Sequence, residues 1–493
     1  MLGMDDDSAI LAPGPPDWLH SRTRYGEPVS DRWDAVIVGA GPNGLTAAAR
    51  LAVAGRRVLV LEAAGTIGGG ARTKVLGPDA RYDVCAAAHP FGATSPAFET
   101  LRLHEHGLAW AHPPIALAHP FDDGTAAVLD RDLGRMIDRL GIDGERWRRL
   151  VGWMAEDWDR LRHLVLGPLI ANVFRHPLAL ARFGLPAALP AVGASHLLRT
   201  REARALLIGM GAHGGIPQTH PTTAGVGLTL AAAAHAGGMP VAVGGSQSIV
   251  DALASVVRGA AGEIVCDHPV ERIADLPPAT AVLLDLTPGQ AADLLGRPRP
   301  RWKRGVAAWK IDLVLREPMP WLAQPCRIAG TIHLGGDPSD IANGERATAR
   351  GRLPERPYVI VTQPTIADPG RAPGRHVLWA YRHVPNGCDD ARATDGIDAQ
   401  FDRFAPGWRD LVEHRQVTTA LGYAAYNRSY EGGDIAGGAM TPWQTVARPR
   451  LALDPYRTKI EGVWLCSQST PPGPGVHGMC GWHAAGSVLR HQP

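Results

Sequence analysis

The most constraining feature of the sequence is a glycine motif, Gly-Ala-Gly-Pro-Asn-Gly, at residues 39–44. It follows the apolar run DAVIV at residues 34–38, which predicts a buried strand. The Ala/Leu-rich segment LTAAARLAVAG comes next and predicts a helix, and RRVLVLE then predicts a second strand that ends at Glu62. The order of strand, glycine turn, helix and strand predicts a β-α-β unit that binds a dinucleotide.

Each position of the motif has a physical task. Gly39 permits a tight turn, Gly41 lets the backbone approach a pyrophosphate, and Gly44 lets the helix pack closely on the strand. The N-terminus of the helix favours the negative charge of the phosphates. A carboxylate at the end of the second strand, about 20 residues further on, can bind ribose hydroxyls. We therefore predict cofactor-binding roles for Gly39, Gly41, Pro42, Asn43, Gly44, Glu62 and Ala63.

A second match to the same glycine spacing, GMGAHG at residues 209–214, lacks this context. It follows ARALLI, which predicts a helix, and Pro217 would stop any helix after it. No strand that ends in an acidic residue follows at the required distance. We expect a loop here and a single dinucleotide-binding unit in the chain.

The residues after Glu62 favour a flavin over a nicotinamide. The run EAAGTIGGGART at residues 62–73 resembles the E-x5-GG-x2-R-S/T extension of the glutathione-reductase-type flavoproteins. The resemblance implies that Gly68 and Gly69 let the loop pass close to FAD. It also implies that Arg72 meets the pyrophosphate and that Thr73 hydrogen-bonds near it. Three residues join the predicted cofactor-binding set: Gly69, Gly70 and Arg72.

The C-terminal part of the chain points to a family. CSQSTPPGPGVHGMCGWHAAGSVL, at residues 466–489, resembles the C-terminal flavin motif of the phytoene-dehydrogenase-like FAD-dependent oxidoreductases. YNRSYEGGDIAGGAMTPWQ, at residues 426–444, resembles the GGDI-x-GG segment of that family, and residues 242–273 resemble its GGxxxLxxAL segment. The matches follow in order along nearly the whole chain. They are most similar to the branch of the pyridine nucleotide-disulfide oxidoreductase domain proteins, and the carotenoid desaturases look more distant.

The resemblance implies an α/β fold: a Rossmann-type, glutathione-reductase-like FAD-binding domain with a discontinuous α+β substrate domain and a helical cap. The implied pieces are residues 31–110, 240–300 and 440–493 for the FAD-binding domain, and residues 111–239 and 301–439 for the substrate domain, with the cap at about 131–205. Residues 1–30 are expected to form a loose tail.

The resemblance also places two further segments at the cofactor. Val270 would lie beside the adenine. A Gly/Pro-rich loop would pass beside the isoalloxazine, where its backbone N–H groups and the positive end of the last helix can reach the ring. The residues of that loop are Gly475, Val476, His477, Gly478 and Met479.

Two residues are candidates for catalysis. Only four lysines occur, and Lys310 lies in the apolar run VAAWKIDLVLREPMPW. That run resembles the strand of the monoamine-oxidase-like superfamily that carries a lysine beside the flavin, although strand alternation could instead put Lys310 on a solvated face. Among the 20 histidines, His477 is the best placed for contact with cofactor or substrate. The other histidines in short loop-like motifs are His89, His213 and His333.

Composition excludes several other classes of protein. Fifty basic and 48 acidic residues leave a net charge of +2, which gives no basic excess for binding nucleic acid. The six cysteines form no CxxC pair and no His/Cys cluster has zinc spacing, so we expect no metal and a reducing, cytoplasmic location. The apolar segment 164–198 predicts a buried helical cap or, less favoured, a surface that makes peripheral contact with a membrane.

These features predict an FAD-dependent dehydrogenase or desaturase that takes a hydride from a C–C or C–N bond of a small lipophilic substrate. With one dinucleotide unit, we expect oxygen, a quinone or a carrier protein to accept the electrons. One alternative is an amine-oxidase-like enzyme acting on a small amine, which predicts an aromatic cage drawn from Trp309, Trp379, Trp443 or Trp482. The other is a non-catalytic scaffold protein in which FAD is structural.

Overall fold

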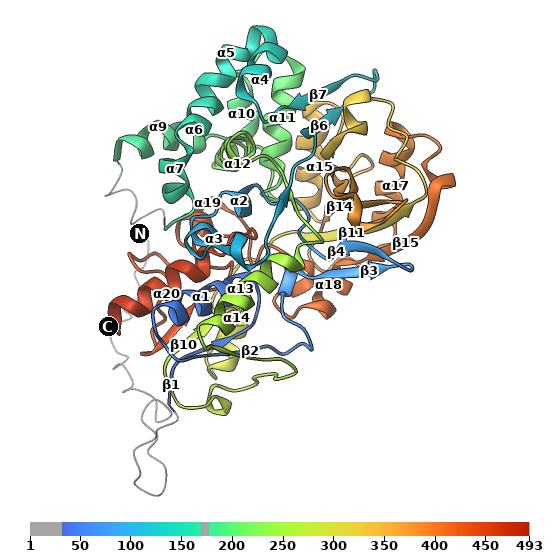
Figure 1. Ribbon diagram of the computed structural model, residues 1–493. Coiled ribbons are helices and arrows are strands. Elements are labelled where there is room, and N and C mark those ends of the chain that lie inside the picture. Colours follow the sequence, from blue (N-terminus) through green and yellow to red (C-terminus); the bar gives the residue numbers. More distant parts are fainter. Residues whose placement is uncertain (1–31, 169–176, 493) are drawn as a thin grey trace, which may run out of the picture.

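The computed structural model describes residues 32–168 and 177–492, so the predicted tail at 1–30 lies outside the described residues. Two large β-sheets and a group of helices make up the described part (Figure 1). The first sheet is parallel, with strand order β16-β10-β1-β2-β9. Its strands are β1 (Trp33–Val38), β2 (Val58–Leu61), β9 (Glu263–Val265), β10 (Ala279–Leu284) and β16 (Val463–Leu465).

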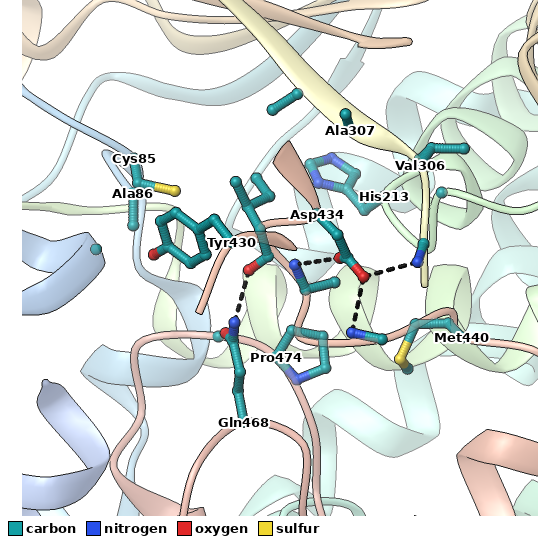
Figure 2. Close-up of a pocket in the computed structure, with 18 of the residues that line it drawn as sticks. Cys85, Ala86, His213, Val306, Ala307, Tyr430, Asp434, Met440, Gln468 and Pro474 are labelled. Atoms are coloured by element: carbon teal, nitrogen blue, oxygen red, sulfur yellow. Dashed lines mark hydrogen bonds between the residues drawn. The ribbon is translucent and has the colours of Figure 1, made fainter. Parts of the chain in front are cut away.

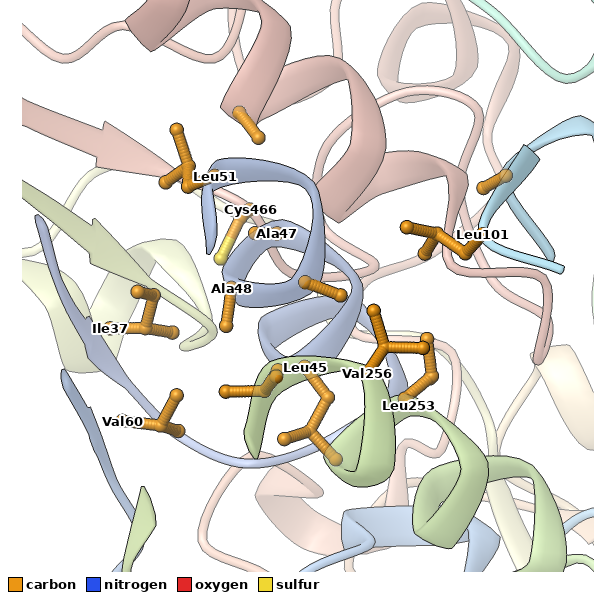
Figure 3. Close-up of a cluster of buried hydrophobic side chains, with 14 of the residues drawn as sticks. Ile37, Leu45, Ala47, Ala48, Leu51, Val60, Leu101, Leu253, Val256 and Cys466 are labelled. Carbon is orange, nitrogen blue, oxygen red and sulfur yellow. The ribbon is translucent and has the colours of Figure 1, made fainter. Parts of the chain in front are cut away.

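Three helices cover one face of this sheet: α1 (Pro42–Val53), α13 (Gln247–Gly259) and α20 (Met479–His491). The predicted strand–glycine turn–helix–strand unit is therefore present, as β1, α1 and β2. Figure 3 shows α1 beside the sheet and α13, with Leu45, Ala47 and Ala48 of α1 in the shared apolar core. Because alanine side chains are small, α1 can lie close to both neighbours, and α1 contacts α20 along the same core.

The second sheet has strand order β15-β11-β14-β13-β12-β6-β7 and is antiparallel except for the β6–β12 pair. Its strands are β6 (Ile115–Pro120), β7 (Ala126–Leu129), β11 (Ala307–Leu315), β12 (Ala329–Leu334), β13 (Val359–Thr362), β14 (His376–Val384) and β15 (Val412–Thr418). Two helices, α15 (Pro338–Ala349) and α17 (Arg392–Phe404), pack against it. The two sheets draw their strands from the two predicted groups of segments, and the exact domain boundaries stay predictions.

The helical cap is seen at the top of Figure 1 and has its own apolar core. It contains α4 (Leu133–Leu140), α5 (Gly144–Trp147), α6 (Trp153–Glu156), α7 (Trp158–Val165), α9 (Pro177–Ala187), α10 (Ala191–Ser195), α11 (Arg201–Ala212) and α12 (Thr223–Gly237). In the described part of segment 164–198, Leu164, Phe183 and Leu198 are buried in this core, as the cap interpretation predicts. Residues 169–176 lie outside the described residues.

The loop expected at residues 209–214 is wrong for its first part, because residues 209–212 belong to helix α11. The glycines of this helix allow neighbouring residues to pack closely against it. A Cβ atom on Gly211 would lie 2.6 Å from Oε1 of Gln218, and one on Gly227 of α12 would lie 2.8 Å from the carbonyl oxygen of Leu207. Close packing of α11 on α12 therefore outweighs the low helix propensity of glycine.

Shorter elements connect the layers. A hairpin of β3 (Thr73–Leu76) and β4 (Ala80–Asp83) extends from the first sheet toward β14 and β15 of the second. The remaining α-helices of the described ranges are α2 (Pro90–Ala93), α3 (Pro96–Thr100), α14 (Pro288–Leu294), α16 (Pro364–Ala367), α18 (Ala420–Tyr426) and α19 (Pro442–Val446). None of the helices in the described ranges has both the length and the hydrophobicity needed to cross a bilayer.

Candidate cofactor and substrate site

A cavity of about 700 Å³ lies at the carboxyl ends of β1, β2 and β10. Ligands of open parallel sheets bind at this edge. Ten of the predicted cofactor-binding residues line the cavity: Gly39, Gly41, Pro42, Asn43, Glu62, Ala63, Gly69, Gly70, Arg72 and Val270. Residues that are far apart in the sequence, in particular the glycine motif and Val270, therefore meet at one site.

The glycine motif leaves room for a ligand at the N-terminus of α1. Gly39 has φ +103°, and a Cβ atom on Gly44 would lie 2.1 Å from the carbonyl oxygen of Gly39. The N-cap residue of α1 is Gly41, which has no side chain to cap the helix, and the first turn of α1 holds no acidic residue. Oδ1 of Asn43 is buried at the cavity wall without a hydrogen-bond partner among the described residues. A bound dinucleotide fits this arrangement, since it can fill the space and satisfy the orphaned acceptor.

Glu62 is held in place at the end of β2. Its Oε2 accepts a hydrogen bond of 2.8 Å from the backbone N–H of Ala40, and its Oε1 accepts one of 3.0 Å from that of Ala64. Nη2 of Arg72 lies 3.4 Å from Oε1 of Glu62, and Nη1 of Arg72 donates to the hydroxyl of Tyr426. These bonds fix the carboxylate at the cavity wall, where the sequence predicts ribose binding.

A smaller cavity of about 210 Å³ adjoins the first and lies between the two sheets. The two cavities share Pro42, Asn43, Gly70, Tyr430 and Gln468 as lining residues. The smaller cavity is also lined by the start of β11, by β14 and by Gly475 and Val476 of the C-terminal loop. The glycine motif near the start of the chain and the C-terminal loop thus line two adjoining cavities.

Buried polar groups hold the loops around the smaller cavity, as Figure 2 shows for Asp434. The carboxylate of Asp434 accepts backbone N–H hydrogen bonds from Gly305, Ala436 and Gly438, at 2.7, 2.9 and 2.9 Å. The guanidinium of Arg448 donates to the carbonyl oxygens of Gln468 and Ala436. Burial lowers the pKa of Arg448 to about 10, so it stays charged at neutral pH. These contacts tie the GGDI-x-GG segment to the loop that follows β16.

The predicted C-terminal loop is only partly at the cavity. Gly475 and Val476 line it, but His477, Gly478 and Met479 line neither cavity. His477 is buried, and its Nδ1 accepts a hydrogen bond of 3.0 Å from the backbone N–H of Met479. Burial lowers the pKa of His477 to about 4. His477 is therefore a neutral group that holds the start of α20, and its predicted catalytic role has no support in this geometry.

Lys310 is fully buried and lines neither cavity, so the solvated-face alternative is wrong. Its Nζ donates to the carbonyl oxygens of Asp83 at 2.6 Å and Val84 at 3.0 Å, and lies 2.8 Å from Oδ2 of Asp312. Burial lowers the pKa of Lys310, and Asp312 opposes that shift. The ammonium fixes the segment that carries Cys85 into the cavity wall. This makes Lys310 a positioning residue, and direct contact with a flavin stays a prediction.

The tryptophan cage predicted for the amine-oxidase alternative is also wrong. None of Trp309, Trp379, Trp443 and Trp482 lines the smaller cavity. Ala308 lines it instead, and alternation along β11 turns the neighbouring Trp309 into the core of the second sheet. The aromatic residues at the cavity are Tyr381 and Tyr430.

Sequence reasoning missed several lining residues. Asp285 directly follows β10, and an acidic residue at the carboxyl end of a parallel strand could have indicated it. Tyr381 and His383 come from β14, with no local motif around them. Tyr430 lies just before the GGDI-x-GG segment, but that motif did not indicate the tyrosine itself. Only the packing of the two sheets brings them together.

Comparisons with known proteins show what the chain is similar to. The family model described as an NAD(P)-binding Rossmann-like domain matches residues 37–113. Pyridine nucleotide-disulfide oxidoreductase domain-containing protein 2 of Mus musculus is 26% identical over 574 residues, which cover 96% of each chain. Hydroxyneurosporene desaturase of Cereibacter sphaeroides is 28% identical over 508 residues, which cover 92% of this chain and 97% of the desaturase.

Solved structures show the same fold. An oxidoreductase from Methanosarcina mazei aligns with a TM-score of 0.58 and 16% identity, covering 92% of this chain and 99% of that one. Putrescine oxidase aligns with a TM-score of 0.57 and 16% identity, covering 93% and 99%. The predicted α/β Rossmann-type fold, the predicted family and FAD as the cofactor are confirmed. Along more than nine tenths of its length the chain is similar to pyridine nucleotide-disulfide oxidoreductase domain-containing protein 2 and to hydroxyneurosporene desaturase.

Proposed function

We propose that this chain is an FAD-dependent dehydrogenase or desaturase that acts on a C–C or C–N bond of a largely apolar, small lipophilic substrate. The observation that carries the proposal is the smaller cavity, which opens directly onto the dinucleotide cavity between the two sheets. Much of its wall is apolar, from Val306, Ala307, Ile435, Met440 and Val476. Such a wall favours an apolar substrate and excludes water from the reacting atoms.

In this proposal the residues of the chain bind and orient the cofactor and the substrate. FAD, when bound, supplies an acceptor for a hydride, which is chemistry that protein side chains lack. The N-terminus of α1 and the fixed carboxylate of Glu62 would hold its dinucleotide part. The backbone at Gly475 and Val476, with the walls given above, would hold the ring end and the substrate side by side.

A second candidate, an amine-oxidase-like activity on a small amine, is favoured by one observation. Tyr381 and Tyr430 both line the smaller cavity, and aromatic rings can bind an amine or its cation. The fold alone is shared with putrescine oxidase. For either activity we propose oxygen, a quinone or a carrier protein as the electron acceptor, because β1-α1-β2 is the one unit of the described ranges that carries the dinucleotide motif.

Anaerobic spectroscopy of the purified yellow protein tests the proposal. Lipids, carotenoids and amines are added one class at a time, and loss of the oxidised-flavin absorption band is recorded. An apolar compound that bleaches the band supports the first candidate, and bleaching by small amines alone supports the second. If dithionite bleaches the flavin and no compound does, FAD is structural and the proposal fails.

A variant that fills the smaller cavity sharpens this test. Ala308→Leu would place extra carbon atoms in the cavity wall, so substrate bleaching should slow at least about tenfold while FAD content stays the same. The control is Val53→Leu, at a position of α1 where the side chain is 63% exposed. Equal rates for the two variants would place the substrate elsewhere.

A further inference from the structure

A buried histidine–carboxylate pair stands at the wall of the smaller cavity. His383, on β14, lines the cavity, and its Nδ1 lies 2.9 Å from Oε2 of Glu345 on α15. The exposed fractions of His383 and Glu345 are 8% and 3%. A carboxylate can only accept a hydrogen bond, so Nδ1 of His383 carries a proton, and in the neutral imidazole the lone pair is then on Nε2.

That lone pair lies on the cavity side of the ring. Gly214 and Gly215 line the cavity beside His383, and a Cβ atom built on Gly215 would lie 3.9 Å from Nε2. Gly215 has φ +60° and carries no side chain that could cover the imidazole. Within residues 32–168 and 177–492, the His383 ring makes one side-chain hydrogen bond, from Nδ1 to Glu345. Nε2 is thus an acceptor that faces the space for a substrate.

A second imidazole stands next to it. His213, at the end of α11, lines the same cavity, and its Nε2 lies 3.0 Å from Nε2 of His333. Burial is the main cause that lowers the pKa of His213 to about 3, and a positive charge on the nearby His383 would act in the same direction. His213 is therefore neutral and adds no positive charge that would repel an amine. A hydrocarbon placed beside His383 would leave Nε2 of the neutral imidazole unpaired.

We propose that Nε2 of His383, oriented by Glu345, accepts a hydrogen bond and then a proton from an N–H or O–H group on the reacting carbon of the substrate. This inference rests on the proposed function and deepens it: the substrate is an otherwise apolar molecule with one neutral amine or hydroxyl group, and the bond that is oxidised is C–N or C–O. His383 would be a catalytic residue, and Glu345 a positioning residue.

The atoms and electrons balance as follows. The reacting C–H bond loses a hydride, with its electron pair, to the oxidant FAD. The N–H or O–H bond breaks, its proton goes to Nε2 of His383, and its electron pair becomes the second bond between carbon and nitrogen or oxygen. The carboxylate of Glu345 then lies against the imidazolium and stabilises its charge.

Binding of three compounds of nearly equal shape tests the proposal without turnover. Cumylamine, 2-phenyl-2-propanol and tert-butylbenzene carry NH₂, OH and CH₃ on a carbon that has no hydrogen, so none of them can lose a hydride. Calorimetry on the FAD-loaded protein should give an affinity at least about tenfold higher for the amine or the alcohol than for the hydrocarbon. Which of the two binds better identifies the donor group.

Variants separate this inference from the proposed function. In His383→Gln the amide can still donate to Glu345 but the imidazole lone pair is lost, so the preference should fall to about twofold or less while FAD content is unchanged. His119→Gln, at a fully buried histidine of β6 that contacts the carbonyl oxygen of Gly336, should keep the preference. If the hydrocarbon binds as tightly as both donors, if neither donor binds, or if His383→Gln keeps the preference, the inference is overturned. Loss of FAD from the wild type would instead contradict the proposed function.

The role of Glu345 has a spectroscopic signature. The Nδ1 proton of His383 should resonate far downfield in the proton NMR spectrum of the FAD-loaded protein, because its acceptor is charged. Glu345→Gln should move that resonance upfield and weaken donor binding, with FAD content unchanged. An unshifted resonance would show that Glu345 does not orient His383.

Discussion

Oδ2 of Asp285 accepts a hydrogen bond of 3.0 Å from the backbone N–H of Gly44, which joins the carboxyl end of β10 to the first turn of α1. Asp285 also lines the dinucleotide cavity. Burial raises the pKa of Asp285 to about 7; the Gly44 N–H opposes this shift and the charge of Glu62 adds to it. A carboxyl group that changes charge near neutral pH therefore lies where the pyrophosphate of FAD is expected.

The first prediction is that FAD binds more weakly as Asp285 ionises. Below about pH 7 the carboxyl group is neutral, and above it a carboxylate repels the phosphates. The dissociation constant of FAD should rise about three- to tenfold between pH 6 and pH 8, measured by flavin fluorescence. Asp285→Asn should flatten this dependence, whereas Asp251→Asn, an exposed position on α13, should not. A wild-type affinity that is the same at both pH values would contradict the expectation.

The same group links stability to pH. Its folded-state pKa of about 7 is above the ordinary value of 3.8, so the folded FAD-free protein holds a proton that the unfolded chain has lost. The contribution to the free energy of unfolding is full below about pH 4 and is lost as the pH rises through 7. Denaturant unfolding of the FAD-free protein should show Asp285→Asn to be less sensitive to pH over this range. If the free energy of unfolding changes with pH in the same way in the variant and in the wild type, this expectation is wrong.

Gly44 tests the close approach of α1 to the glycine turn. A Cβ atom there would lie 2.1 Å from the carbonyl oxygen of Gly39, so Gly44→Ala must displace the backbone. We expect FAD affinity to fall at least about tenfold and the free energy of unfolding to fall by about 2 kcal/mol. Gly259→Ala, at the end of α13 with no atom within 4 Å of the added Cβ, should change neither quantity by much. Equal behaviour of the two variants would refute the packing argument.

Glu62 should contribute to affinity through its charge and its fixed position. Glu62→Gln keeps the shape but replaces one acceptor oxygen by a donor, which disturbs the bonds to the N–H groups of Ala40 and Ala64. Titration with FAD should show a loss of affinity of about tenfold. Glu263→Gln on the exposed edge strand β9 is the matched control and should leave the affinity unchanged.

We expect Lys310 to contribute to the free energy of unfolding. Lys310→Met leaves Asp312 as an unpaired buried carboxylate and should lower the free energy of unfolding by about 3 kcal/mol. The double variant Lys310→Met/Asp312→Leu removes both charges and should recover most of that loss. Urea unfolding with FAD bound checks both. If the double variant is as unstable as the single one, the bonds of Lys310 to the carbonyl oxygens of Asp83 and Val84 dominate instead.

The sequence predicted those parts of the molecule whose local pattern determines their structure. The strand, glycine turn and helix around Gly41 are local, and so they lie where expected. Tertiary packing decided the rest. Helix α11 extends through Gly211 because a close helix–helix contact needs small residues. Lys310 donates to the backbone carbonyl oxygen of Asp83, which is far away in the sequence, so the pattern of its own strand could not predict this contact. His383 and Glu345 come from separate elements, so their contact exists only in the folded chain.

The central claim is that the glycine turn at residues 39–44 and the C-terminal loop at Gly475 and Val476 bind one FAD molecule between them. The direct measurement is the amount of flavin released by denaturing the purified protein, together with its location in an experimental structure. The account predicts about one FAD per chain, with its pyrophosphate at the N-terminus of α1 and its ring at the smaller cavity. A colourless protein that does not take up added FAD, or a flavin bound elsewhere, would contradict it.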